Sequence, residues 1–148
     1  MRFDAFGFPI ILHNVPMKKV AGEWFFDIRM NALQEQVLFL LCQKEGALTG
    51  AEVRFIRKYL GMTKTDFAKI TGVTYPAVAK WENQANKCTK MSPAIEIIIR
   101  LFAIEKLFPT GKEFIQQYRK LMSRQIEGYA SQKILPIELN IDKEKLAA

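Results

Sequence analysis

The chain of 148 residues predicts a mainly α-helical fold with a small β-hairpin at its N-terminus. From residue 31 onward, apolar residues recur at helical spacing between residues that cap or stop helices. β-Branched and aromatic residues are instead concentrated in two runs within the first 30 positions. We therefore divide the chain into a β-hairpin region at 1–30, a helical region at 31–108, and a C-terminal helix with its tail at 109–148.

The N-terminal region contains the runs FPIILHNVPMKKV and EWFFDIRM, and the segment KVAGE between them offers a glycine turn. This pattern predicts a two-stranded hairpin, or part of a small sheet. A lone hairpin is marginally stable in water, so we expect it to pack on the helices or to pair with another chain. The tail from Ile134 to Ala148 alternates in ILPIELNI before it becomes charged. We expect a short extended segment there that pairs with the hairpin, followed by a frayed end.

One long helix is expected before residues 48–91 and another after them. The first is expected from Asn31, its possible cap, to Glu45, before Gly46. The second is expected from the cap Ser92 to about Leu107, with a proline at its first position. It is apolar on more than one face, so we expect it to be central to the core. A final helix is expected over 112–127.

Between Leu48 and Met91 the sequence encodes three short helices. Two capping boxes, each a threonine followed three residues later by an acid, predict helices over about 51–60 and 64–70. The capping boxes are Thr49 with Glu52 and Thr63 with Asp66. Glycines at positions 61 and 72 end these two helices. Thr74 caps the third helix, which holds a proline in its first turn, where a missing amide costs nothing.

The second and third of these helices have the spacing of a helix-turn-helix. Helices that meet steeply across a short turn need a small residue at their contact, which is Ala68, and a residue tolerant of positive φ, which is Gly72. The residues on the expected inward faces are Phe67, Val73, Val78 and Trp81. This combination in a basic chain predicts a DNA-binding unit with residues 75–83 as its recognition helix. A plain helical hairpin would also use glycine and capping residues.

The stretch RKYLGMTKTDFAKITGVTYPAVAKWEN resembles the DNA-binding domain of the Cro-like, Xre-type repressors. The longer run LTGAEVRFIRKYLGMTKTDFA, together with FGFPIILHNVP, is more narrowly similar to the MqsA-type antitoxins. The resemblance implies an Xre-type helix-turn-helix bundle with a helical C-terminal extension. It also implies a regulator that represses its own operon and binds a cognate toxin.

The N-terminal part of the MqsA-type antitoxins is a zinc-binding module whose ligands are two Cys-x-x-Cys pairs. Where the second pair would fall, this chain reads MKKVAGE, and the first pair would have to precede Met1. His13, Cys42 and Cys88 are too few and too scattered for a tetrahedral site, so we expect neither metal nor another cofactor. We interpret His13 as a strand side chain and the two cysteines as reduced thiols.

A recognition helix contacts bases with its N-terminal residues and with its outward face one and two turns later. The base-reading candidates are Thr74, Tyr75, Pro76, Ala77 and Lys80. Of these, Lys80 can donate to guanine, Ala77 can contact a thymine methyl, and Tyr75 can donate to a phosphate or a base acceptor. The phosphate candidates are Thr63, Lys64, Lys69, Lys87 and Lys90. Each lysine could instead be an ordinary solvated surface residue.

Arg57 and Glu82 match, by position, an arginine–glutamate pair that the resembling family places between its first helix and its recognition helix. The resemblance therefore implies a structural role for these two residues. A partly buried ion pair at this place would fix the angle of the recognition helix.

The net charge of +7 favours an anionic partner, although it does not distinguish nucleic acid from a membrane surface or an acidic protein. No apolar run is long enough to span a bilayer and no signal peptide is recognisable, so we expect a cytoplasmic protein. No Asp/Glu/His cluster suggests catalysis. The leading hypothesis is a homodimeric regulator that binds a double-stranded operator, specifically an autorepressing antitoxin. The alternatives are a stand-alone or phage-like repressor without a toxin, and a protein-interaction module that uses the fold as scaffold.

Overall fold

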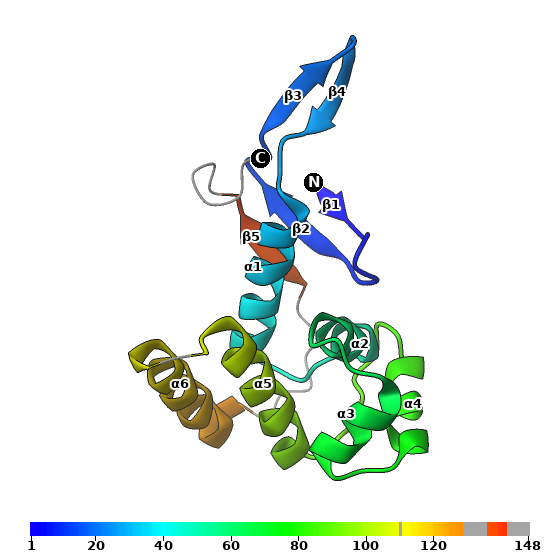
Figure 1. Cartoon of the computed structure of the whole chain (residues 1–148), viewed down its shortest axis with the longest axis vertical. Helices are drawn as coiled ribbons and strands as arrows, with labels where there is room; N and C mark the ends of the chain where they lie inside the picture. The colour runs from blue at the N-terminus through cyan, green and yellow to red at the C-terminus, as the bar shows by residue number, and fades with distance from the viewer. Residues whose placement is uncertain (110, 129–135, 142–148) are drawn as a thin grey trace.

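The computed structural model describes residues 1–109, 111–128 and 136–141. They form a mainly helical protein with two small β-sheets. In chain order the elements are β1 (Arg2–Phe3), β2 (Ile10–His13), β3 (Met17–Val20), β4 (Glu23–Phe26), α1 (Met30–Gln43), α2 (Gly50–Tyr59), α3 (Lys64–Thr71), α4 (Tyr75–Asn83), α5 (Pro93–Leu107), α6 (Lys112–Gly128) and β5 (Ile137–Asn140). Helices α2 to α6 lie at one end of the molecule and the β3–β4 hairpin at the other, with α1 and the three-stranded sheet between them (Figure 1).

The three short helices begin where their caps predict. The Thr49 hydroxyl accepts a hydrogen bond from the Glu52 amide at 3.2 Å, and the Glu52 carboxylate accepts one from the Thr49 amide at 2.9 Å. Thr63 and Asp66 form the second capping box in the same way, with distances of 3.1 and 3.4 Å. Gly72 ends α3 in the left-handed conformation at φ 71°. These helices match the predicted ranges to within about two residues because capping is a local interaction.

The first long helix is present within two residues of its predicted ends, but its predicted cap is wrong. Helix α1 begins after Arg29, whose side chain makes no capping hydrogen bond, and Asn31 lies inside the helix instead of capping it. The helix ends at Gln43, two residues before the predicted Glu45. Lys44 leaves the helical conformation, and its carbonyl oxygen accepts a hydrogen bond from the guanidinium of Arg100 at 2.6 Å.

The N-terminal region contains four strands in two sheets, whereas the sequence predicted a two-stranded hairpin or part of a small sheet. The run FPIILHNVPMKKV divides into β2 and β3, with Asn14 at a positive φ of 56° between them. Strand β2 lies between β1 and β5 and pairs with β5 in parallel, from Ile10 opposite Ile137 to His13 opposite Asn140. The tail therefore pairs with an N-terminal strand, as expected. Its partner is β2, which is not part of the β3–β4 hairpin. The frayed end expected beyond position 141 lies outside the described residues.

The β3–β4 hairpin projects from the rest of the molecule (Figure 1). Every residue of its two strands is exposed. The expectation that the hairpin packs on the helices is therefore wrong for β3 and β4, and the expectation that it pairs with another chain stays a prediction. Residues opposite each other in the register share a face, which places Met17 beside Phe26 and Lys19 beside Trp24. Trp24 is 64% exposed. The amide of Asp27 donates to the Pro16 carbonyl at 2.8 Å, which closes the base of the hairpin.

The hydrophobic core lies where α1 packs against both β5 and α5. The core side of α1 is completely buried, through Leu33, Val37, Leu38 and Leu41. Helix α5 is less central than its apolar sequence predicted, because only one of its faces is buried. That face carries Ile99, Ala103 and Ile104, together with the charged residues Glu96 and Arg100.

Arg100 and Glu96 form a buried ion pair on α5, with 2.7 Å between Arg100 Nη2 and Glu96 Oε1. The same guanidinium donates to three carbonyl oxygens, that of Cys42 in the last turn of α1 and those of Lys44 and Gly46 in the chain between α1 and α2. Glu96 also accepts from the amide of Leu48 at 3.1 Å. The segment 44–49 is therefore fastened to α5 by charge-assisted hydrogen bonds, which are stronger than neutral ones.

A second buried ion pair joins the start of this segment to the first turn of α2. Lys44 Nζ lies 2.7 Å from Glu52 Oε1, and both side chains are nearly inaccessible to solvent. Because Glu52 also completes the capping box with Thr49, this carboxylate holds both the segment and the first turn of α2.

Gly50, the first residue of α2, lies directly against the end of α4. Its amide donates to the Lys87 carbonyl at 3.2 Å, and the next amide, that of Ala51, donates to the Ala85 carbonyl at 2.8 Å. A Cβ atom at position 50 would collide with the carbonyl oxygen of Trp81. Only glycine therefore allows the two helices to approach this closely.

We expect Gly50→Ala to lower the free energy of unfolding by about 2–3 kcal/mol, because the backbone of α4 has to move away from the added methyl group. Gly61→Ala is the control: a Cβ there meets nothing within 4 Å, and only the positive φ of 70° is unfavourable. That strain costs about 1 kcal/mol. Urea unfolding of both variants measures the difference. Equal losses would show that the α2–α4 contact yields easily.

Candidate nucleic-acid interface

Helices α3 and α4 are packed together and joined by the three residues Gly72, Val73 and Thr74. The Val73 amide donates to the carbonyl of Ala68 at 3.0 Å, so the turn closes directly on α3. Phe67 and Val78 are completely inaccessible to solvent at the contact between the helices. The turn and the contact residues therefore stand where the sequence spacing placed them.

Helix α4 has one buried and one exposed side. Val78 and Trp81 point into the core, whereas Tyr75 is 51% exposed and Lys80 is also exposed. Of the other base-reading candidates, Pro76 is exposed and Ala77 is half-buried. The Thr74 hydroxyl accepts from the Ala77 amide at 3.3 Å, so it can still donate its own proton to a ligand.

Arg57 and Glu82 form a bidentate ion pair between α2 and α4. Arg57 Nη2 lies 2.9 Å from Glu82 Oε1, and Arg57 Nε donates to both carboxylate oxygens at 3.2 and 3.1 Å. The guanidinium also donates to the Met62 carbonyl at 2.9 Å, which links it to the loop before α3. The side chains are only 10% and 4% exposed. This pair therefore ties α4 to α2 through two rigid planar groups.

The structure brings only some of the phosphate candidates close to the exposed side of α4. The Nζ atom of Lys64 lies 6.0 Å from the centre of the Tyr75 ring, so the beginnings of α3 and α4 are adjacent. Lys69 is in the last turn of α3, roughly 7 Å further along the helix, and cannot hold the same phosphate as Lys64. Thr63 is exposed at the N-cap of α3, and its hydroxyl accepts from the Asp66 amide.

Lys87 and Lys90 lie in the loop that follows α4, and both side chains are exposed. The carbonyl of Lys87 accepts from Gly50, so the backbone beneath this lysine is fixed to the start of α2. Lys90 has a positive φ of 60°. A basic side chain on anchored backbone can contact a phosphate with little loss of backbone entropy.

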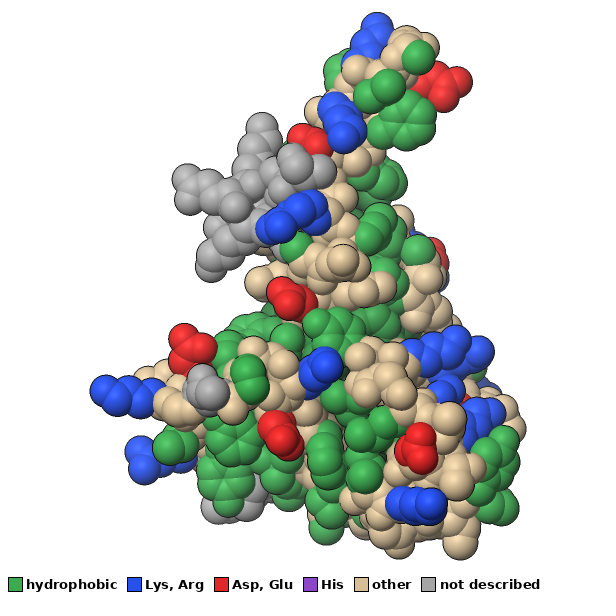
Figure 2. Space-filling view, viewed as in Figure 1, with side chains coloured by type: hydrophobic (Ala, Val, Ile, Leu, Met, Phe, Trp, Pro, Cys, Tyr) green, Lys and Arg blue, Asp and Glu red, His purple; other side chains and the backbone are tan. Residues whose placement is uncertain are grey.

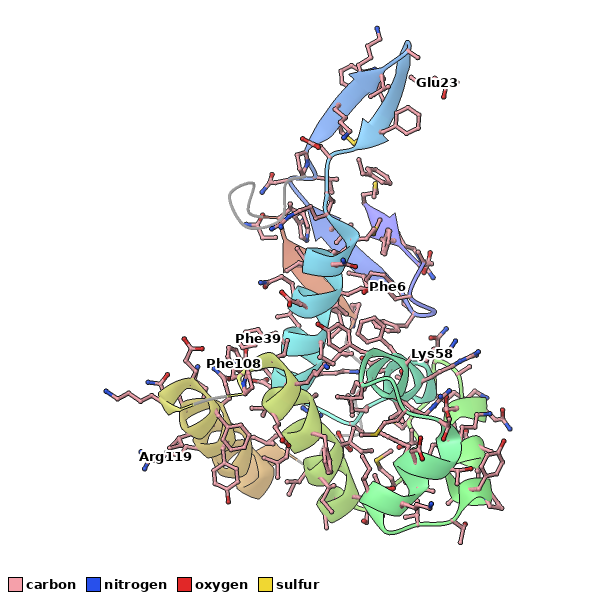
Figure 3. The ribbon with its side chains drawn as sticks, in the orientation of Figure 1. Phe6, Glu23, Phe39, Lys58, Phe108 and Arg119 are labelled. Atoms are coloured by element: carbon pink, nitrogen blue, oxygen red, sulfur yellow. The ribbon has the colours of Figure 1, made fainter. Side chains whose placement is uncertain are left out.

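Two basic residues that sequence reasoning missed are Arg54 and Lys58. They are exposed on α2, opposite the buried Val53 and Ile56, and one turn apart. Lys58 lies at the end of α2 on the side of α4 (Figure 3). Basic side chains gather along the side of the molecule formed by α2, α3 and α4 (Figure 2). The amphipathic pattern of α2 was the signal that could have revealed this pair.

A groove of about 730 Å³ runs beside this basic side, between the β1–β2 loop, α1 and α2. Phe6, Glu35, Arg54, Lys58 and Tyr59 are among its lining residues. Burial, together with the negative charge of Glu35, raises the pKa of Tyr59, so its phenol remains a hydrogen-bond donor at neutral pH. The lining therefore combines basic, acidic and aromatic groups without any arrangement of nucleophile and base.

Cys42 and Cys88 do not form a disulfide. Burial raises the pKa of the Cys42 thiol to about 12, which makes it unreactive in the folded state. No group of three His, Cys, Asp or Glu side chains in ranges 1–109, 111–128 and 136–141 is arranged to hold a metal ion. None of the helices described is long and apolar enough to cross a membrane.

Comparison with protein-family models, curated proteins and solved structures gave no match for this chain. The geometry of α2, α3 and α4 and their exposed side chains are therefore the basis for the function proposed below.

Arg57→Ala should lower the free energy of unfolding by about 3–5 kcal/mol, because it leaves the Glu82 carboxylate buried without a partner. Lys80→Ala removes an exposed side chain and should change stability by less than about 0.5 kcal/mol. Thermal or urea melts of both variants give the comparison. Small and equal shifts would mean that the ion pair does not hold α4.

Proposed function

We propose that the protein is a sequence-specific DNA-binding transcriptional regulator, in which α3 and α4 are a helix-turn-helix of Xre type and α4 enters the major groove. The observation that carries the proposal is the two-sided character of α4. Its inner side is locked by Val78, Trp81 and the Arg57–Glu82 ion pair, while its outer side presents Tyr75 and Lys80 to solvent. A rigid helix with an exposed polar face is what direct reading of base edges needs.

The surroundings of α4 support the same function. Basic residues precede and follow α4 in the chain: Lys64 at the start of α3 is half-buried, and Lys87 and Lys90 after α4 are exposed. The free amides at the start of α3 add a partial positive charge suited to a phosphate. The net charge of +7 favours approach to DNA at long range. A module that used this fold only as scaffold would not need basic residues at these positions.

A single recognition helix covers only about four or five base pairs, too few to define one site in a genome. We therefore propose that the protein acts as a homodimer on an operator with two half-sites.

Within this class, one observation favours an autorepressing antitoxin over a stand-alone repressor. An antitoxin needs a protein-binding surface that leaves the DNA-reading helix free. The β3–β4 hairpin exposes Met17, Val20, Trp24, Phe25 and Phe26 at the end of the molecule far from α4 (Figure 1). Aromatic residues on a projecting element are enriched in protein–protein contacts. We propose that a cognate toxin binds there.

Lys80→Ala should weaken binding to the operator by about 1–3 kcal/mol and remove the preference at one base position per half-site, because Lys80 is assigned to a guanine. Lys87→Ala should weaken binding to operator and scrambled DNA alike and lower the salt slope by about one unit. Titration of a duplex from upstream of the protein's own gene, at two salt concentrations, measures both effects.

The control for this experiment is Lys112→Ala, which removes an equal charge at the start of α6 and should leave binding and its salt slope unchanged. If Lys80→Ala weakens both DNAs equally, Lys80 contacts the backbone and specificity rests on Tyr75, Ala77 and DNA shape. Affinity that does not depend on salt would refute the electrostatic account.

For the antitoxin hypothesis, Trp24→Asp should abolish association with the product of a small neighbouring reading frame while leaving DNA binding intact. The reason is that Trp24 is the most exposed of the hairpin's aromatic residues and lies far from α4. Co-expression and co-purification, with DNA titration in parallel, measure the two activities. Retained association would place the toxin elsewhere on the protein.

A further inference from the structure

An apolar groove of about 400 Å³ lies between α5 and α6. Hydrophobic side chains gather over these two helices in the space-filling view (Figure 2). The residues that line the groove are Ile98, Leu101, Phe102, Glu105, Phe114 and Tyr118. Ile115, which is 47% exposed, extends the apolar surface along α6. Among the described residues of the lining, Glu105 alone is charged, so a small polar ligand would find little to recognise.

The groove explains why α5 is apolar on more than one face. One face, with Ile99 and Ile104, is buried against the core. The other face, with Ile98, Leu101 and Phe102, remains partly exposed although α6 packs beside it. Phe114 and Tyr118 of α6 are stacked with their ring centres 6.5 Å apart, so the opposite wall of the groove is preformed.

We propose that a second copy of this chain covers the groove, so that α5 and α6 form the dimer interface; this inference rests on the proposed function, which requires two recognition helices. In a twofold arrangement, each copy presents the same apolar surface to the other, and the contact is closed. The occupant is therefore the protein itself.

The position of the groove fits a DNA-binding dimer. Helix α5 packs directly against α3. In a dimer joined through α5, the contact between α3 and α5 would therefore set the orientation of each helix-turn-helix unit. The other exposed apolar surface, the β3–β4 hairpin, lies at the opposite end of the molecule from α4 (Figure 1). Two copies joined tip to tip at their hairpins would hold the recognition helices far beyond one turn of DNA, about 34 Å.

The area of the surface matches a reversible dimer. The described side chains around the groove are few, so the interface they form is small, near the lower limit of about 1,000 Å² of total buried area for specific contacts. We therefore expect a dimer that dissociates in the micromolar range and is strengthened by DNA.

Two neighbouring residues of α6 provide a matched test. Tyr118→Glu places a carboxylate in the groove, whereas Arg119→Glu places the same group on a side chain that points away from α5 (Figure 3). Sedimentation of the full chain over a range of concentrations measures the dimer dissociation constant. Tyr118→Glu should raise it at least about tenfold, and Arg119→Glu should change it less than about threefold.

Circular dichroism checks that both variants fold, and Ile98→Glu on α5 replaces Tyr118→Glu if the latter unfolds. Equal dimerisation of the groove and control variants, or a wild-type protein that stays monomeric even with DNA, would overturn the proposed interface. The proposed function fails differently: a protein that dimerises through this groove but ignores duplex from upstream of its gene keeps the interface and loses the DNA-binding role.

Discussion

The buried guanidinium of Arg100 joins α5 to the end of α1 and to the segment that leads into α2. It pairs with Glu96 and donates hydrogen bonds to three carbonyl oxygens, one in the last turn of α1 and two in the segment between α1 and α2. Carbonyl oxygens that are removed from water need such partners. An ion pair inside a core adds little net stability by itself, because both charges lose their hydration. Its value here is geometric, since no apolar side chain could satisfy those carbonyls and fix the direction in which the chain enters α2.

Helices α3 and α4 inherit their orientation from this segment. Glu52 connects the segment to the first turn of α2, Gly50 lets α2 lie against the end of α4, and the Arg57–Glu82 pair then fixes α4 to α2. In each contact a buried charged side chain, or at Gly50 the backbone itself, meets the next element. Helix α4, which reads DNA in the proposed function, is therefore held by a continuous series of contacts that begins at Arg100.

Sequence alone predicted the features that depend on neighbouring residues. The capping boxes and the turn at Gly72 were predicted correctly because each involves only a few adjacent positions. The roles of Glu96 and Arg100 were missed, since charged residues in an apolar helix look like its solvated side until the partners from another part of the chain are known. The exposure of the hairpin could not be predicted either, because a run of β-branched and aromatic residues has the same pattern whether its faces are buried or exposed to solvent.

The parallel pairing of β2 with β5 has a consequence for how the chain folds. Ile10 and Ile137 are neighbours in the sheet but almost the whole sequence separates them. Closing so long a loop is entropically unfavourable, so this sheet should form late, after α2, α3 and α4 have made their local contacts. During synthesis, β2 leaves the ribosome without its partner and its buried side chains remain exposed until β5 arrives. The N-terminal part of the protein is thus completed by a strand that is made long after it.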